Sequence, residues 1–107
     1  MENKFHFTIE DAKALLNNSE QGFVQVTQNG LMKIEYYAPI KTDEQTPHRQ
    51  DELYIIVSGN SDFYREGKTI KCKKGDVIFV SAQKEHKFVN FSDDFATWII
   101  FYGEEIY

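Results

Sequence analysis

The sequence predicts an all-β sandwich or barrel that folds as one domain over residues 1–107. From residue 23 onward, apolar side chains alternate with polar ones in short runs, which is the period of a half-buried strand. Turn-forming pairs such as Asn29-Gly30, Glu66-Gly67 and Lys74-Gly75 separate these runs at regular intervals. A chain of 107 residues is long enough for one hydrophobic core and too short for two domains.

A short helix is expected ahead of the strands, over residues 9–16. Thr8 supplies a hydroxyl cap, Glu10 and Asp11 place acidic charge in the first turn, and apolar residues recur at helical spacing. The stretch Asn17-Asn18-Ser19 ends the helix, because these side chains compete with the backbone for hydrogen bonds.

Eight strands are expected after the helix, each of the usual length in globular proteins. They lie at residues 23–27, 31–37, 52–57, 61–64, 69–72, 76–80, 86–91 and 95–102. Short strands at such spacing are typical of an all-β sandwich or barrel. Aromatic side chains pack well on pleated surfaces, so we expect these residues in the core and lining the barrel: Tyr36, Tyr54, Phe79, Phe88, Trp98 and Phe101.

The charge balance and composition exclude several classes of function. Seventeen acidic residues against twelve basic ones give a formal net charge of -5, the wrong sign for neutralising nucleic-acid phosphates. No apolar run approaches the ~20 residues that cross a bilayer, and the N-terminus has no signal-peptide pattern, so no membrane partner is expected. Cys72 is the only cysteine. It is expected to be a small buried residue and fits a reducing, cytoplasmic location.

Two of the three histidines lie near strand ends among polar residues. If the strand that carries Glu52 begins before His48, positions 46, 48, 50 and 52 share one face, and strand curvature would bring His48 and Glu52 together. His86 begins another strand and adds a third group only if the fold joins the two strands. Two imidazoles and a carboxylate are the ligand set of mononuclear Fe, Mn, Ni or Zn sites. Alternatively, these residues are hydrogen-bonded polar groups without a metal.

Two spaced patterns resemble the conserved motifs of the cupin superfamily. The first places His48 four residues before Glu52, with Gly59 seven residues after it. The second is Gly75-(x5)-Ser81-x-Gln83-(x2)-His86-(x3)-Asn90, which matches the family spacing throughout. The resemblance covers roughly residues 31–102 and is closest to small single-domain members of the cupin-2 type. It implies an antiparallel jelly-roll (double-stranded β-helix) barrel of six to eight strands.

The resemblance also implies a metal site inside that barrel, with three of the family's four ligands at His48, Glu52 and His86. The family's first histidine falls on Thr46, so the fourth position is open to Thr46, to Gln50 or to water. Tyr54 and Phe88 share strand parity with Glu52 and His86, so both are expected to line the pocket.

Function is less determined than fold, because one barrel scaffold hosts many activities. We expect a metal-dependent enzyme acting on a small organic molecule, with oxygenase-like or sugar-isomerase-like chemistry. The alternative is a non-catalytic binding or sensing domain with a structural metal or none. The candidates for proton transfer are Tyr36, Tyr54 and Gln50. A homodimer is expected through residues 23–37, because edge strands of small barrels often pair with a second copy.

Overall fold

The computed structural model describes residues 4–43 and 45–107. The helix α1 spans Ile9–Leu16, as predicted. All eight expected strands are present, and their ends differ from the predicted ends by at most two residues. The strands are β1 (Phe23–Asn29), β2 (Met32–Tyr37), β3 (Asp51–Ser58), β4 (Asn60–Arg65), β5 (Lys68–Lys73), β6 (Val77–Val80), β7 (His86–Val89) and β8 (Ala96–Tyr102).

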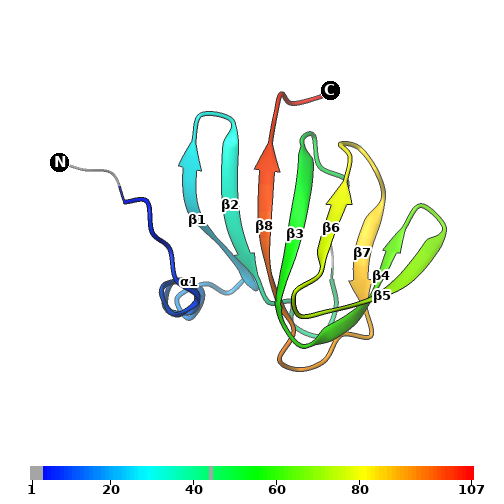
Figure 1. Cartoon of the computed structure of the whole chain (residues 1–107), viewed down its shortest axis with the longest axis horizontal. Coiled ribbons are helices and arrows are strands. Elements are labelled where there is room, and N and C mark those ends of the chain that lie inside the picture. The colour runs from blue at the N-terminus through cyan, green and yellow to red at the C-terminus, as the bar shows by residue number, and fades with distance from the viewer. Residues whose placement is uncertain (1–3, 44) are drawn as a thin grey trace.

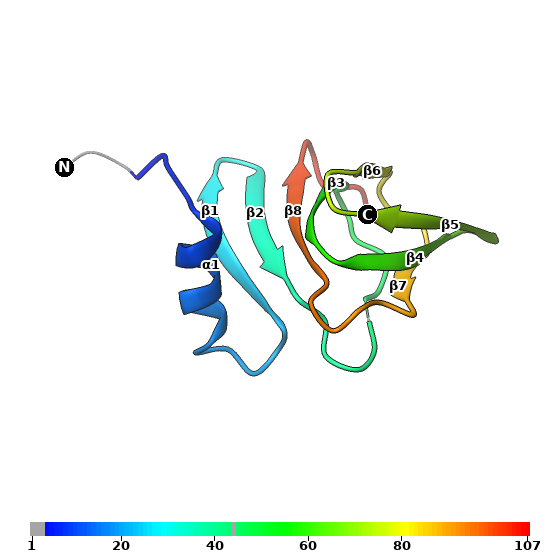
Figure 2. The ribbon, with the colours of Figure 1, turned by 60° about the horizontal axis from the view of Figure 1, so that its bottom comes forward.

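The strands form two antiparallel sheets that enclose the interior, confirming an all-β jelly-roll fold (Figure 1). The larger sheet has five strands in the order β1-β2-β8-β3-β6, and the smaller has three in the order β5-β4-β7. Figure 2 shows the smaller sheet closing over β3 and β6, while β1 and β2 extend to one side. Several neighbouring strands, such as β2 and β8 or β4 and β7, are therefore far apart in the sequence, and β3 and β7 contribute to one interior.

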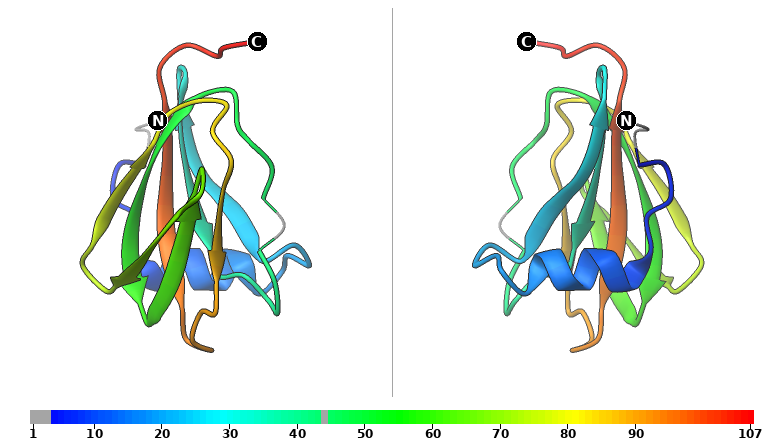
Figure 3. Two further views of the ribbon diagram at one scale, coloured as in Figure 1. Left: turned by 90° about the vertical axis from the view of Figure 1, so that its right-hand side faces the viewer. Right: turned by 90° about the vertical axis from the view of Figure 1, so that its left-hand side faces the viewer.

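The helix α1 crosses one end of β1 and β2 on the outer face of the larger sheet (Figure 3). Its capping box is complete: Asp11 N donates to Thr8 Oγ1 at 3.0 Å, and Thr8 N donates to the Asp11 carboxylate at 3.3 Å. Ala12 packs against Tyr36, whose ring meets Trp98 edge-on at 5.2 Å. Tyr36 is thus buried outside the barrel, beneath the helix. The helix gives this end of the sheet a core of its own.

The barrel interior is an aromatic core. The Phe88 ring lies 5.0 Å from Tyr54, 4.8 Å from Phe63 and 4.8 Å from Phe95, centroid to centroid. Cys72 is also buried in this cluster, as expected. These close ring contacts contribute stabilisation beyond the burial of their area.

The expectation that Phe79 and Trp98 line the barrel is wrong. Along β6 the side chains of Ile78 and Val80 are buried, so the alternation of the strand turns Phe79 outward, where it is 44% exposed. Trp98 lies on the helix-covered outer face of β8. Both strands are apolar on two faces, and the amino-acid pattern alone does not say which face is internal.

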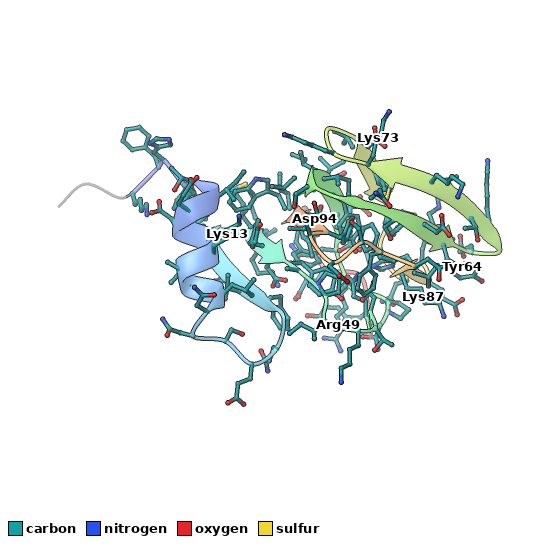
Figure 4. All side chains as sticks on the ribbon, turned by 90° about the horizontal axis from the view of Figure 1, so that it is seen from below. Lys13, Arg49, Tyr64, Lys73, Lys87 and Asp94 are labelled. Carbon is teal, nitrogen blue, oxygen red and sulfur yellow. The ribbon has the colours of Figure 1, made fainter. Side chains whose placement is uncertain are left out.

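The outer surface of the smaller sheet carries long polar side chains. Lys87 lies over the Tyr64 ring, 6.0 Å from its centroid, where β4 and β7 pair (Figure 4). Within the described part of the chain, no helix has the length and apolar character needed to cross a membrane.

Candidate metal centre

Three potential ligand side chains converge inside the barrel. His48 precedes β3, Glu52 is the second residue of β3, and His86 is the first residue of β7. One nitrogen or oxygen atom from each lies within 4.8 Å of the others. Glu52 and His86 are buried, whereas the His48 side chain is 32% exposed. The fold therefore joins both histidines to the carboxylate, with His48 on the accessible side.

His48 lies just before a bend, so no strand runs from residue 46 to residue 52, and His48 and Glu52 do not share a strand face. β3 begins only at Asp51, after a bend at residues 49–50. The carbonyl of His48 accepts a hydrogen bond from Gln83 N at 2.7 Å, and that of Arg49 accepts one from Ile106 N at 2.7 Å. These bonds hold the segment outside the sheet. A turn of the chain, rather than strand curvature, carries His48 to Glu52.

The converging atoms are close but do not form well-directed hydrogen bonds. His48 Nδ1 lies 3.3 Å from Glu52 Oε2, and His86 Nε2 lies 2.7 Å from Glu52 Oε1. His48 Nδ1, Glu52 Oε2 and His86 Nε2 are buried and have no hydrogen-bond partner among the described residues. Buried polar atoms without partners are rare in native structures. Here all three are directed toward one small region.

The backbone fixes the orientation of the His86 ring. His86 Nδ1 lies 2.8 Å from the carbonyl oxygen of Lys84. A carbonyl can only accept, so Nδ1 carries the proton, and in the neutral ring Nε2 presents a lone pair. That lone pair faces an oxygen of Glu52, which also only accepts when ionised. A cation, either a proton or a metal ion, must lie at this junction for both groups to be satisfied.

The electrostatics of the pair agree with this geometry. Burial by itself raises the pKa of Glu52, but the nearby imidazoles of His48 and His86 outweigh it and lower the pKa. Burial by itself lowers the pKa of His86, but the approach of Glu52 raises it above the ordinary value. The buried site therefore favours negative charge on the carboxyl and positive charge beside it.

Tyr54 joins the site to a loop that the sequence did not identify as functional. Its hydroxyl lies 2.8 Å from Gln45 Oε1 and 3.1 Å from Glu52 Oε1. Burial and the charges of Glu52 and Asp43 raise the pKa of Tyr54 well above its ordinary value. Gln45 Nε2 in turn donates to Asp43 at 2.8 Å, and Phe88 N donates to the same carboxylate at 2.7 Å. The loop is thereby tied to both β3 and β7.

The other predicted site residues lie in different places. Tyr36 is wrong as a proton-transfer candidate, because it packs beneath α1 on the outer face of the sheet. Thr46 is exposed at the rim of the cavity described below. Gln50 is buried, and its Nε2 donates to the carbonyls of Leu31 at 2.6 Å and Gly103 at 3.0 Å. Gln50 thus anchors the start of β3 to two neighbouring segments.

A cavity of about 760 Å³ opens beside His48. It is lined on one side by the inward-facing residues of β2, namely Lys33, Glu35 and Tyr37, and by Phe101 of β8. The His48 ring packs edge-on against Phe101 at 4.9 Å. Glu35 was not recognised from the sequence. Its alternation with Lys33 and Tyr37 was the available signal, but the apolar neighbours Ile34 and Tyr36 suggested the opposite face.

The residues present fit a divalent transition metal. Two imidazoles and one carboxylate are a recognised facial ligand set that leaves coordination positions open. The three partnerless buried atoms supply one nitrogen, one oxygen and one nitrogen to a common space. The contact of His86 Nδ1 with a backbone carbonyl is the outer contact that metal-bound histidines usually make.

A jelly-roll barrel with a 2-His-1-carboxylate group in its interior defines the class of protein. The family model for the cupin domain, Cupin_2, matches residues 33–102. The chain belongs to this family, as the two sequence motifs indicated. Cupins often bind metals, and the His48, Glu52 and His86 group lies where the motifs imply a metal site.

Individual relatives extend the match over most of the chain. The uncharacterized protein SCO3923 of Streptomyces coelicolor is 30% identical over 97 residues, which are 89% of this chain and 92% of that protein. A solved structure of unknown function from Rhizobium leguminosarum has a TM-score of 0.75 at 21% identity, covering 96% of this chain and 100% of the other. A putative mannose-6-phosphate isomerase from Ralstonia eutropha has a TM-score of 0.55 at 23% identity, covering 73% and 78%.

Proposed function

We propose that this protein is a metal-binding cupin in which His48, Glu52 and His86 hold one divalent transition metal, and that it acts on a small organic molecule. The observation that carries the proposal is the arrangement of three buried, partnerless ligand atoms around one region. Two acceptor groups, the Glu52 carboxylate and the neutral His86 ring, approach within 2.7 Å only if a cation lies between or beside them.

The cavity supplies the second half of the proposal. Its volume of about 760 Å³ is within the ordinary range for small-molecule sites. His48 is the ligand that faces this space, while Glu52 and His86 are buried behind it. A bound Fe, Mn, Ni or Zn ion would polarise an oxygen ligand as a Lewis acid, and Fe or Mn would add redox chemistry. Phe101 packs against His48 and shields one side of the site from water.

Metal analysis of the purified protein tests the proposal. Untagged protein prepared without chelator is analysed beside His48→Ala, Glu52→Ala and His86→Ala. His6→Ala is the matched control, because His6 is exposed and distant in sequence from the three ligand residues. We expect near-stoichiometric metal in the wild type and in the His6 variant, and loss from the other three. No binding by the wild type after incubation with Fe(II), Mn(II), Ni(II) and Zn(II) would overturn the proposal.

A second candidate function is a non-catalytic binding or sensing domain. The observation in its favour concerns Tyr54, the tyrosine nearest the site. Its hydroxyl faces Gln45 and Glu52, and its pKa is raised well above the ordinary value, so it does not serve as a base. The two functions are separated by incubating the metal-loaded protein with small-molecule mixtures. Conversion of a compound, followed by mass spectrometry, indicates an enzyme, and thermal stabilisation without conversion indicates a binding domain.

The assembly and location of the protein remain predictions. We expect a homodimer in which residues 23–37 form the contact, since β1 is an edge strand of the larger sheet. Phe23 at the start of this strand is 37% exposed. Light scattering during size-exclusion chromatography measures the assembly, and Phe23→Glu is expected to weaken a dimer that uses this edge. A cytoplasmic location is likewise expected, and nucleic acid is not an expected partner.

A further inference from the structure

The strand register places a second carboxyl group on the same sheet face as Glu52, beside the metal site. On the inner face of the larger sheet, Glu35 of β2 is opposite Ile99 of β8, which is opposite Tyr54 of β3. Glu52 lies on the next inward-facing row of β3, opposite Phe101. The backbones that carry the two carboxyl groups are therefore separated by one intervening strand, about 10 Å at the usual strand spacing. Both side chains project from this one face, so a small molecule lying on it can contact Glu35 and the metal site together.

Glu35 has no structural task of its own. It is half-buried, and no residue of the described ranges donates a hydrogen bond to its carboxylate. Burial raises its pKa, and the charge of Glu52 adds to the rise, while His48 and Lys33 oppose it. These influences show that the Glu35 carboxyl lies within electrostatic range of two of the three metal-site residues. It is not one of the three converging groups.

We propose that Glu35 is a ligand-binding residue whose carboxylate accepts a hydrogen bond from an N–H or O–H group of the molecule at the open side of the metal site. This inference rests on the proposed metal-binding function. It names a substrate class: organic oxygen ligands that carry a donor group next to their metal-binding oxygen, such as hydroxy acids, hydroxy ketones and hydroxamates.

The chemistry of the cavity favours such a ligand. A half-buried carboxylate without a hydrogen-bond partner interacts most strongly with an N–H or O–H donor, because hydrogen bonds to charged groups are stronger than those between neutral groups. Simple anions without a proton would meet the negative charges of both Glu35 and Glu52. Lys33, over the Phe101 ring at 5.4 Å, offsets part of that charge at the rim.

The test uses a matched pair of chelators on the Zn-loaded or Ni-loaded protein. Acetohydroxamate and N-methylacetohydroxamate bind metals through the same two oxygens, but only the first has an N–H donor. We expect the wild type to prefer acetohydroxamate about tenfold, as for one hydrogen bond to a charged acceptor. Glu35→Leu should reduce this ratio to within twofold, and Glu35→Gln to an intermediate value. Glu104→Gln, at an exposed position outside the cavity lining, should retain the wild-type ratio.

Direct metal titration precedes the chelators and separates the two proposals. If the wild type binds no metal, the proposed function is overturned and this inference falls with it. If all variants bind metal but the chelator ratio is the same in the wild type and Glu35→Leu, only the role of Glu35 is overturned. A loss of metal affinity above tenfold in Glu35→Leu would make Glu35 a metal ligand instead, which also contradicts the inference. Circular dichroism confirms that each variant is folded.

Discussion

The two ends of the barrel interior differ in chemistry although the same strands build both. On β7, His86 faces the metal site and Phe88, two residues further, enters the aromatic core. On β3, Glu52 and Ile56 divide in the same way, with Tyr54 between them. The aromatic end is sealed by rings at 4.8 to 5.0 Å, whereas the polar end opens into a cavity. The potential metal ligands and the aromatic core residues therefore lie on adjacent stretches of the same strands.

Tyr54 marks the boundary between the two ends. Its ring packs against Phe88, and its hydroxyl contacts Glu52. We therefore expect the rings of the sealed end to contribute most of the packing stability, and the charged groups of the open end to contribute mainly to metal binding. Deleting a core ring removes apolar contacts and leaves a cavity that the surrounding structure only partly fills. The following predictions test that division.

Deleting a ring at the sealed end should have the largest effect. Phe88→Ala removes a side chain that contacts Tyr54, Phe63 and Phe95, and we expect the free energy of unfolding to fall by about 3 to 5 kcal/mol. Phe79→Ala, on the exposed outer face of β6, should cost less than about 1 kcal/mol. Denaturant unfolding of both metal-free variants measures the difference. Equal losses would show that the aromatic cluster is not the main core.

Neutralising the carboxylate at the open end should affect metal binding more than folding. Glu52→Gln keeps the shape of the side chain but removes the charge between His48 and His86. We expect metal affinity to fall by at least about 100-fold, since loss of even outer contacts costs 10- to 100-fold. In the metal-free protein the free energy of unfolding should also fall, because protonated His86 loses its buried counter-charge. Competition titration gives the affinity, with Glu105→Gln at the cavity rim as the control.

The sequence predicted the strands and the identity of the converging residues better than their surroundings. Side chains alternate in direction along a strand, which places Glu52 and Tyr54 on a common face, and the spaced motifs implied that His86 joins them. The position of His48 was predicted for the wrong reason, because hydrogen bonds from Gln83 and Ile106, distant in sequence, create the bend that carries it. Such long-range backbone contacts leave no periodic signal in the chain.

The same limit explains why the sequence pointed to Tyr36, and not to Glu35, as a residue near the site. Alternation separates the two faces of β2, but which face is internal depends on what covers the other one. Here α1 buries Tyr36 on the outside, so Glu35 faces the cavity. No sequence signal identifies Asp43 and Gln45, because a loop that links two strands through side-chain hydrogen bonds has no fixed spacing.

Removing Asp43 should loosen the connection between the two ends. Its carboxylate accepts hydrogen bonds from Phe88 N at 2.7 Å and Gln45 N at 3.1 Å. Asp43→Ala leaves a backbone donor of β7 without its partner, and we expect a loss of about 1 to 3 kcal/mol in unfolding free energy. Metal affinity should fall by about tenfold as the loop that precedes His48 loses its anchor. Asp93→Ala, at an exposed position, is the matched control. Unchanged stability in Asp43→Ala would show that the hydrogen bonds of this loop do not stabilise the barrel.

Competition between protons and metal at His86 should give the smallest effect, a change with pH in the melting-temperature shift that the metal produces. Burial opposes but Glu52 raises the pKa of His86 above the ordinary value of 6.5. In the metal-free protein this contribution to stability is complete below pH of about 6.5 and is lost as the pH rises through the raised pKa. The pKa of Glu52 is lowered, so that carboxylate stays ionised over the same range.

Metal binding has the opposite dependence, because a metal requires the neutral imidazole. We therefore expect the rise in melting temperature produced by Zn²⁺ to increase from pH of about 6 to 8, with affinity growing by at most about tenfold per pH unit for each proton released. Thermal unfolding with and without Zn²⁺ at several pH values measures this, and Phe79→Ala serves as a control with an intact site. A metal-induced shift that stays constant with pH would mean that metal binding does not displace a proton from His86. The open end of the barrel would then differ from the sealed end in polarity but not in metal binding at His86.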